Sequence, residues 1–84
     1  MDKTLKEFSV GEAGTVVGIS ATGAVRRRLF DMGITPGADI VLRKVAPLGD
    51  PIEITVRGYQ LSIRKAEAET VKMKSPNVTD RGSR

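Results

Sequence analysis

The chain has 84 residues, a net charge of +4 and 29% charged residues, which together indicate one small soluble domain. It contains neither cysteine nor histidine, so it lacks a disulfide framework, the usual ligands of zinc and the commonest general base. No apolar run approaches the ~20 residues of a membrane span, and the charged start has no signal-peptide core. We therefore expect a cytoplasmic location and no direct membrane insertion.

The first predicted strand is short and spans residues 15–20, which are rich in β-branched side chains. Gly18 within this strand suggests a β-bulge or a close approach of another backbone. A helix is predicted next, over residues 23–32, and Gly33 is placed to adopt the left-handed conformation that ends a helix. The helix carries one apolar stripe at the spacing i, i+4 and i+7, formed by Val25, Leu29 and Met32.

A tight turn is predicted directly after the helix. Pro36 fixes φ for the second turn position, and Gly37 is free to adopt a positive φ. The turn leads into a second strand over residues 39–46. Its apolar residues are nearly continuous, which is typical of a strand covered on both faces.

The second half of the chain contains the clearest strand pattern. Residues 52–57 alternate strictly between apolar and polar side chains. Gly58-Tyr59 fits a two-residue hairpin turn, and residues 60–64 form the returning strand. One helical turn is predicted over residues 65–69 and a short closing strand over residues 71–73.

Five short strands, one helix and tight turns predict a mostly β fold, a small and strongly bent antiparallel barrel. We assign residues 1–74 to this domain. Residues 75–84 are polar and without pattern, so we expect a disordered tail.

Two turn-rich segments, one before and one after the second strand, resemble those of a known family. They read Leu29-Phe30-Asp31-Met32-Gly33-Ile34-Thr35-Pro36-Gly37 and Ala46-Pro47-Leu48-Gly49-Asp50-Pro51-Ile52, followed later by Arg64-Lys65-Ala66-Glu67-Ala68. The combination resembles the FeoA family, the small cytoplasmic partners of the bacterial ferrous iron transporter FeoB. The resemblance implies an SH3-like barrel with an inserted helix, a regulatory role in ferrous iron uptake, FeoB's cytoplasmic region as partner, and a weak family-level link to transition-metal binding.

The strongest candidate for partner binding is the loop after the second strand. It consists of Pro47, Leu48, Gly49, Asp50 and Pro51, and its prolines indicate a stiff connection. Leu48 is predicted at the exposed tip, beside a cleft between the helix and the loop. Tyr59 is a second candidate because aromatic rings hold peptide segments in SH3-like clefts. The alternatives are a loop that only connects two strands and a ring that caps the barrel.

Arginines form the densest charge run, at residues 26–28. The simplest interpretation is a solvated helix face; the alternative is docking on an acidic partner or on anionic lipid. Arg28 and Arg57 are candidates for an arginine supplied to a GTP-hydrolysing partner. A further set is expected to be structural, shaping the helix end and the turns: Leu29, Met32, Gly33, Pro36, Gly37 and Gly58.

Several functions are disfavoured by what the sequence lacks. The carboxylates show no paired spacing, so we expect no metal site and no cofactor. There is no phosphate-binding glycine loop and no nucleophile paired with a base, so we expect no enzymatic activity. A pI near 9.9 is compatible with a nucleic-acid-binding barrel, but three aromatic residues do not make a stacking platform, and we expect no nucleic-acid partner. The remaining alternative is a metal-responsive domain related to the C-terminal domain of iron-dependent repressors. We expect a monomer.

Overall fold

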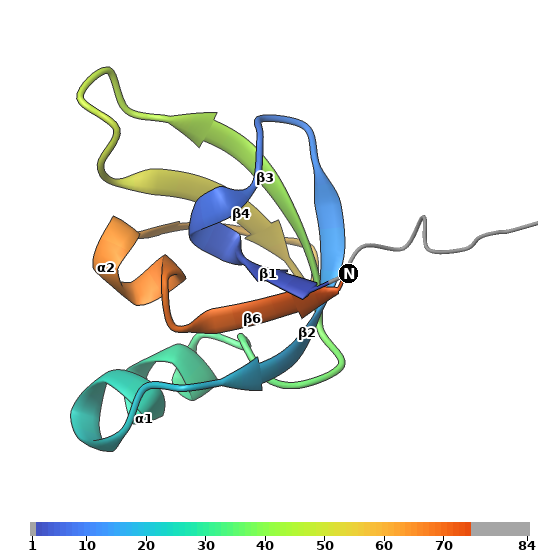
Figure 1. The fold of residues 1–84 in the computed structure, drawn as a ribbon, viewed down its shortest axis with the longest axis vertical. Coiled ribbons are helices and arrows are strands. Elements are labelled where there is room, and N and C mark those ends of the chain that lie inside the picture. Colours follow the sequence, from blue (N-terminus) through green and yellow to red (C-terminus); the bar gives the residue numbers. More distant parts are fainter. Residues whose placement is uncertain (1, 75–84) are drawn as a thin grey trace, which may run out of the picture.

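The computed structural model describes residues 2–74; the predicted disordered tail, residues 75–84, lies outside the described residues. Strands dominate residues 2–74, which also contain two short α-helices and one 3₁₀ helix (Figure 1). In chain order the elements are β1 (Asp2–Thr4), η1 (Leu5–Glu7), β2 (Ala13–Ile19), α1 (Gly23–Asp31), β3 (Asp39–Val45), β4 (Ile52–Val56), β5 (Tyr59–Ile63), α2 (Lys65–Ala68) and β6 (Val71–Lys74).

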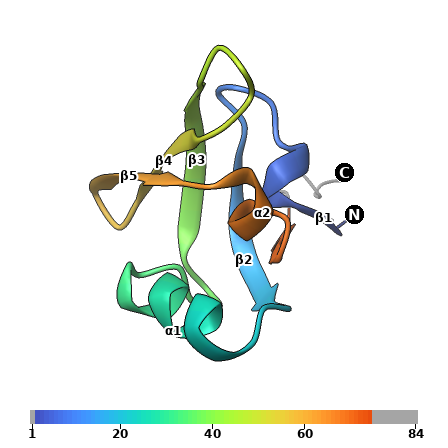
Figure 2. The same ribbon diagram turned by 90° about the vertical axis from the view of Figure 1, so that its left-hand side faces the viewer.

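All strands belong to one antiparallel sheet with the order β1-β6-β2-β3-β4-β5. The sheet bends back on itself (Figures 1 and 2), but β1 and β5 remain its two edges, and no strand ladder joins them within residues 2–74. The predicted mostly β fold is confirmed, whereas the predicted count of five strands is wrong. β1 was missed because its three residues have no strand pattern of their own and become a strand by pairing with β6.

The core lies inside the bend of the sheet. In β4 the residues Ile52, Ile54 and Val56 are buried while Glu53 is exposed, which confirms the predicted alternation. β3 differs from its prediction, since only one face of it is covered and its last three residues are exposed. The other buried apolar side chains come from the remaining strands except β1, from the helices and from the connecting segments: Leu5, Phe8, Val16, Leu29, Ile34, Ala38, Ile40, Leu42, Ile63, Ala68, Val71 and Met73.

The helix α1 is held to the core by its C-terminal end. Ile34 N–H donates to Leu29 O (3.0 Å) and Gly33 N–H donates to Phe30 O (3.0 Å), which is the Schellman arrangement with Gly33 at a φ of 90°. Leu29 and Ile34 are both fully buried. The predicted role of Gly33 is confirmed. The predicted apolar stripe is too long, because Val25 lies in the first turn of the helix, away from this contact, and is exposed.

Two tight turns position the strands that follow. Ala38 N–H donates to Thr35 O (2.9 Å) across Pro36-Gly37, and Gly37 has a φ of 94°, as predicted. The β4–β5 turn is displaced by one residue from its prediction. Val56 pairs with Tyr59, so the central residues are Arg57-Gly58, with φ values of 50° and 84°. Two positive φ values match the strand twist in a two-residue turn.

The register of the ladders shifts twice. One shift separates Val16 and Gly18 in the β2–β6 pairing, as predicted for Gly18, and the other lies in the β3–β4 pairing. Such irregularities bend strands and increase their twist, which helps the sheet to curl around its core. Neither α1 nor α2 is long and apolar enough to cross a membrane, nor is any other helix within residues 2–74.

Candidate protein-binding surface

The loop between β3 and β4 is braced by its own backbone. Gly49 N–H donates to Ala46 O (2.7 Å), which closes a turn with Pro47 in its second position, and Ala46 N–H donates to Pro51 O (3.0 Å) across the loop base. Proline in that position presets the turn. The loop therefore holds one shape without help from a partner.

A second brace ties the loop to α2. The carboxylate of Asp50 accepts a hydrogen bond from the backbone N–H of Lys65 (2.9 Å). The Lys65 ammonium also reaches the loop, 3.6 Å from the position that a Cβ on Gly49 would occupy. Asp50 thus satisfies one of the free N–H groups at the start of α2. The same hydrogen bond holds the loop against α2.

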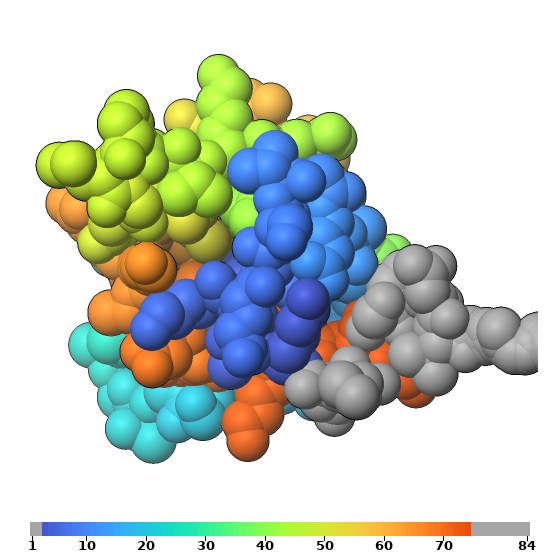
Figure 3. Space-filling model, turned by 45° about the horizontal axis from the view of Figure 1, so that its top comes forward, coloured from blue at the N-terminus to red at the C-terminus, as the bar shows by residue number. Residues whose placement is uncertain are grey.

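Leu48 projects from this braced loop into solvent. Its side chain is 96% exposed, the highest value among the exposed large hydrophobic residues of the described chain. The loop protrudes from the molecular surface in the space-filling view, in yellow-green at the upper left (Figure 3). A stiff loop holding an unburied leucine is well suited to insertion into a partner's apolar pocket.

Tyr59 does not share a surface with Leu48. Tyr59 is 70% exposed and does not cap the core. It pairs with Val56 at one end of β4, whereas the Leu48 loop joins the other end, where Ile52 pairs with Ile63. Four residues of strand separate the two ends by roughly 14 Å.

The predicted cleft between the helix and the loop is not formed. α1 precedes β3 and the loop follows it, so the seven-residue strand β3 holds them at opposite ends of the molecule (Figures 1 and 2). The loop is flanked instead by α2, through Asp50 and Lys65.

Both candidate arginines make contacts within the chain. Arg57 donates from Nε to Gly33 O (3.1 Å) and from Nη2 to Thr35 Oγ1 (2.7 Å). Arg28 pairs with the carboxylate of Glu67 (2.9 Å). The two arginines therefore tie the end of α1 to the β4–β5 turn and to α2. These contacts lie within the chain and do not test the predicted role of either arginine in partner binding.

Glu67 is the residue that the sequence reasoning missed. Its side chain is 10% exposed. One carboxylate oxygen pairs with Arg28, and the other accepts from Arg64 N–H (2.9 Å). The signal was present in the spacing Arg64-x-x-Glu67, because a glutamate three residues after a helix cap reaches back to the cap N–H.

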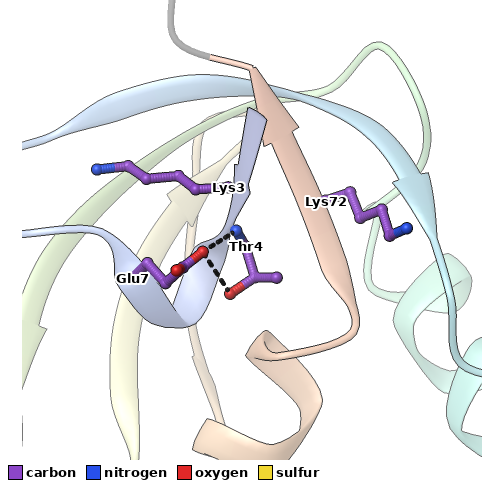
Figure 4. A pocket seen from close by; sticks show the side chains of 4 residues that line it. All are labelled: Lys3, Thr4, Glu7 and Lys72. Carbon is purple, nitrogen blue, oxygen red and sulfur yellow. Dashed lines mark hydrogen bonds between the residues drawn. The ribbon is translucent and has the colours of Figure 1, made fainter. Parts of the chain in front are cut away.

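The remaining charged groups of residues 2–74 do not gather into a metal-ligating cluster. No group of three or more metal-ligating side chains forms within residues 2–74. A hollow of about 290 Å³ is lined by Lys3, Thr4, Glu7 and Lys72, but the two lysines point to opposite sides and Glu7 accepts hydrogen bonds from Thr4 (Figure 4).

The carboxylate of Glu12 is held by two contacts that lower its pKa. Lys3 hydrogen-bonds to it and forms an ion pair (2.7 Å), and Ser9 N–H donates to it (2.9 Å). These contacts lower the pKa of Glu12. Lys3 also lies 5.2 Å from the centre of the Phe8 ring, so this charge cluster secures the N-terminal segment to the sheet.

Comparison with known proteins places the chain in a family. The model of the FeoA domain matches residues 3–74. The chain is 30% identical over 77 residues to an Fe(2+) transport protein A/Fe(2+) transporter FeoB fusion protein of Porphyromonas gingivalis, covering 89% of this chain and 9% of the fusion protein. The chain thus corresponds to a small part of that longer polypeptide.

Solved structures show the same fold. A FeoA-like protein from Clostridium acetobutylicum is 37% identical, with a TM-score of 0.84 and coverage of 94% of this chain and 92% of that one. Stenotrophomonas maltophilia FeoA complexed with zinc, described as a prokaryotic SH3 domain protein, is 25% identical, with a TM-score of 0.74 and coverage of 84% and 88%.

A repressor shares the fold as well. T. acidophilum IdeR is 20% identical, with a TM-score of 0.79 over 88% of this chain and 34% of the repressor; this likeness concerns the fold alone. The family match over residues 3–74, together with the relatives at 30% and 37% identity, shows that the chain belongs to the FeoA family.

Proposed function

We propose that this protein is a regulatory module of ferrous iron uptake that binds the cytoplasmic region of the transporter FeoB through the Leu48 loop, residues 47–51. The family is linked to ferrous iron transport, and in Porphyromonas gingivalis a relative is fused to FeoB in one polypeptide. Fusion keeps two partners at a high effective concentration. The observation that carries the proposal is the 96% exposure of Leu48 on a loop braced by three hydrogen bonds.

The physical basis of docking is burial of this leucine. Transferring one leucine side chain from water to an apolar pocket contributes about 1.5–3 kcal/mol. Because the loop is already held in shape, little ordering entropy opposes binding. A single projecting loop makes a small interface, so the complex is weak or transient, as suits a regulator that binds and releases. The module acts in the cytoplasm as a monomer, without catalysis of its own.

A nuclear magnetic resonance titration of the ¹⁵N-labelled protein with the soluble cytoplasmic region of FeoB tests the proposal. We expect amide shifts centred on Leu48, Gly49 and Asp50. Shifts confined to other surfaces, or none at all, contradict docking through the loop. A parallel titration with Fe(II) alone addresses the metal-responsive alternative, which requires shifts around carboxylates without any protein partner.

A further inference from the structure

The two edges of the sheet differ in how they are protected. β1 is three residues long and includes Lys3. β5 is five residues long, contains neither charge nor proline, and pairs with β4 without any register shift. Natural edge strands are kept from pairing with other chains by shortness, charge, proline or bulges. β5 has none of these protections.

The pairing register identifies the free backbone groups of β5. Val56 and Tyr59 close the two-residue hairpin and form a hydrogen-bonded pair, so alternate residues of β5 bond to β4. The N–H and C=O groups of Gln60 and Ser62 consequently point away from β4. Within residues 2–74 no other backbone or side-chain group bonds to them. Both residues are exposed.

The two ends of this edge are positively charged. Arg57 precedes β5, and Arg64 and Lys65 follow it; all three are exposed. No acidic residue lies between them in the sequence, and the nearest across the sheet is Glu53 of β4, which pairs with Ser62 in the middle of the strand. A strand added at this edge would run between cations at both ends, so acidic side chains near its termini would be attracted.

A second copy of this chain is a poor occupant of the edge. A two-fold antiparallel pairing with the fullest overlap places Gln60 opposite Ser62 of the other copy. In that register the turn that contains Arg57 comes near the Arg64-Lys65 segment of the other copy, and the same occurs at the other end of the pair. Like charges brought together at an interface cost binding energy, so the edge favours an acidic segment over itself.

We propose that the free edge of β5 accepts an extended, acidic protein segment as an additional strand. Hydrogen bonds to the backbone of Gln60 and Ser62 supply the affinity, and Arg57 and Arg64 select the charge. β5 lies below the Leu48 loop in Figure 2, and the two surfaces adjoin at Lys65, whose backbone N–H bonds to Asp50. The proposal does not depend on FeoB as the partner.

The test uses a seven-residue peptide of alternating glutamate and valine with capped ends, titrated into the ¹⁵N-labelled protein. We expect shifts and slowed amide exchange at Gln60 and Ser62, and weaker binding of the matched lysine–valine peptide. Ser62→Pro removes an outward N–H at an edge position that proline tolerates and should reduce affinity at least about tenfold. Ser62→Ala keeps the N–H and should bind like the wild type.

Charge reversal provides an independent check should Ser62→Pro fail to fold. Arg64→Glu changes an exposed side chain whose backbone contact to Glu67 is retained, and it should shift the preference from the glutamate peptide to the lysine peptide. Three results overturn the proposal: no shifts at millimolar glutamate peptide, shifts confined to Arg26 and Arg27, or β5 shifts that follow protein concentration without peptide, which would mark a second copy as the occupant.

Discussion

Among the glycines of residues 2–74, Gly14 is the one whose backbone is most closely approached by the core. A Cβ at this position would lie 2.7 Å from Cζ of Phe8 and 2.9 Å from the backbone oxygen of Lys74. The Phe8 ring, which is almost fully buried, therefore packs directly on the bare backbone of β2. Glycine is needed at position 14 because there is no room for a side chain. A left-handed backbone conformation is not the reason.

Gly14→Ala should lower the free energy of unfolding by about 1–3 kcal/mol, because the backbone oxygen of Lys74 and the Phe8 ring must both move. The matched control is Gly18→Ala on the same strand, where a Cβ meets no atom within 4 Å. Urea denaturation of both variants checks this. Equal stabilities of the two variants would show that Phe8 does not pack on Gly14.

Glu12 gives the protein a defined pH response. Its pKa is lower in the folded state than its ordinary value of about 4.5, so its ionised form stabilises the fold above that pH. The contribution is lost as the pH falls through the lowered pKa of the folded state. Glu12→Gln should therefore be less stable than the wild type at pH 7, with a smaller difference at pH 3. Urea midpoints at both pH values measure this, and a constant difference would contradict it.

At the scale of elements, α1 is held by polar contacts as well as by apolar residues. Leu29 and Ile34 bury one end, while Arg28 pairs with Glu67 on α2 and Arg57 donates to the turn after α1. Each polar contact joins segments that are far apart in sequence. The position of α1 thus depends on α2 and the β4–β5 turn.

Arg28→Ala should destabilise the protein by about 1–3 kcal/mol, since it leaves the nearly buried carboxylate of Glu67 without its ionic partner. Arg27→Ala is the control, because Arg27 is exposed and pairs with no carboxylate among residues 2–74. Thermal unfolding of the two variants distinguishes them. If the two variants had the same midpoint of thermal unfolding, the Arg28–Glu67 pair would make no contribution to stability.

The sequence predicted elements whose determinants are local. The alternation of β4, the bulge at Gly18 and the helix end at Gly33 each depend on nearby residues, and all are confirmed. β1 was missed because its pairing with β6 joins residues at opposite ends of the domain. The β4–β5 turn was displaced because Arg57 adopts a positive φ, unusual outside glycine, while its side chain bonds to Gly33 and Thr35.

The candidate site was predicted less well than the fold. The exposed position of Leu48 could be predicted from its proline-rich loop, which leaves no room to bury it. Its distance from α1 and Tyr59 could not be predicted, because it depends on which end of β3 and β4 each turn occupies. The ion pair of Glu67 could not be predicted, because its partner Arg28 lies on another helix.

At the scale of the whole molecule, the single core makes folding all-or-none. Ile54 is fully buried in the middle of β4. Ile54→Asp would bury an unpaired carboxylate at a cost of several kcal/mol, comparable to the entire stability of a domain of this size. We expect loss of the dispersed amide spectrum. Glu53→Asp, on the exposed face of the same strand, should keep it. A folded Ile54→Asp variant would contradict the strand assignment.

The central claim is that the module docks on FeoB through the Leu48 loop. The most direct measurement is the affinity of the soluble cytoplasmic region of FeoB for the wild type, Leu48→Asp and Val10→Asp, by isothermal titration calorimetry. Val10 is the matched control, as an exposed apolar residue outside the loop. We predict that Leu48→Asp stays folded and binds at least about tenfold more weakly, while Val10→Asp binds like the wild type. Equal affinity of Leu48→Asp and the wild type would contradict docking through this loop.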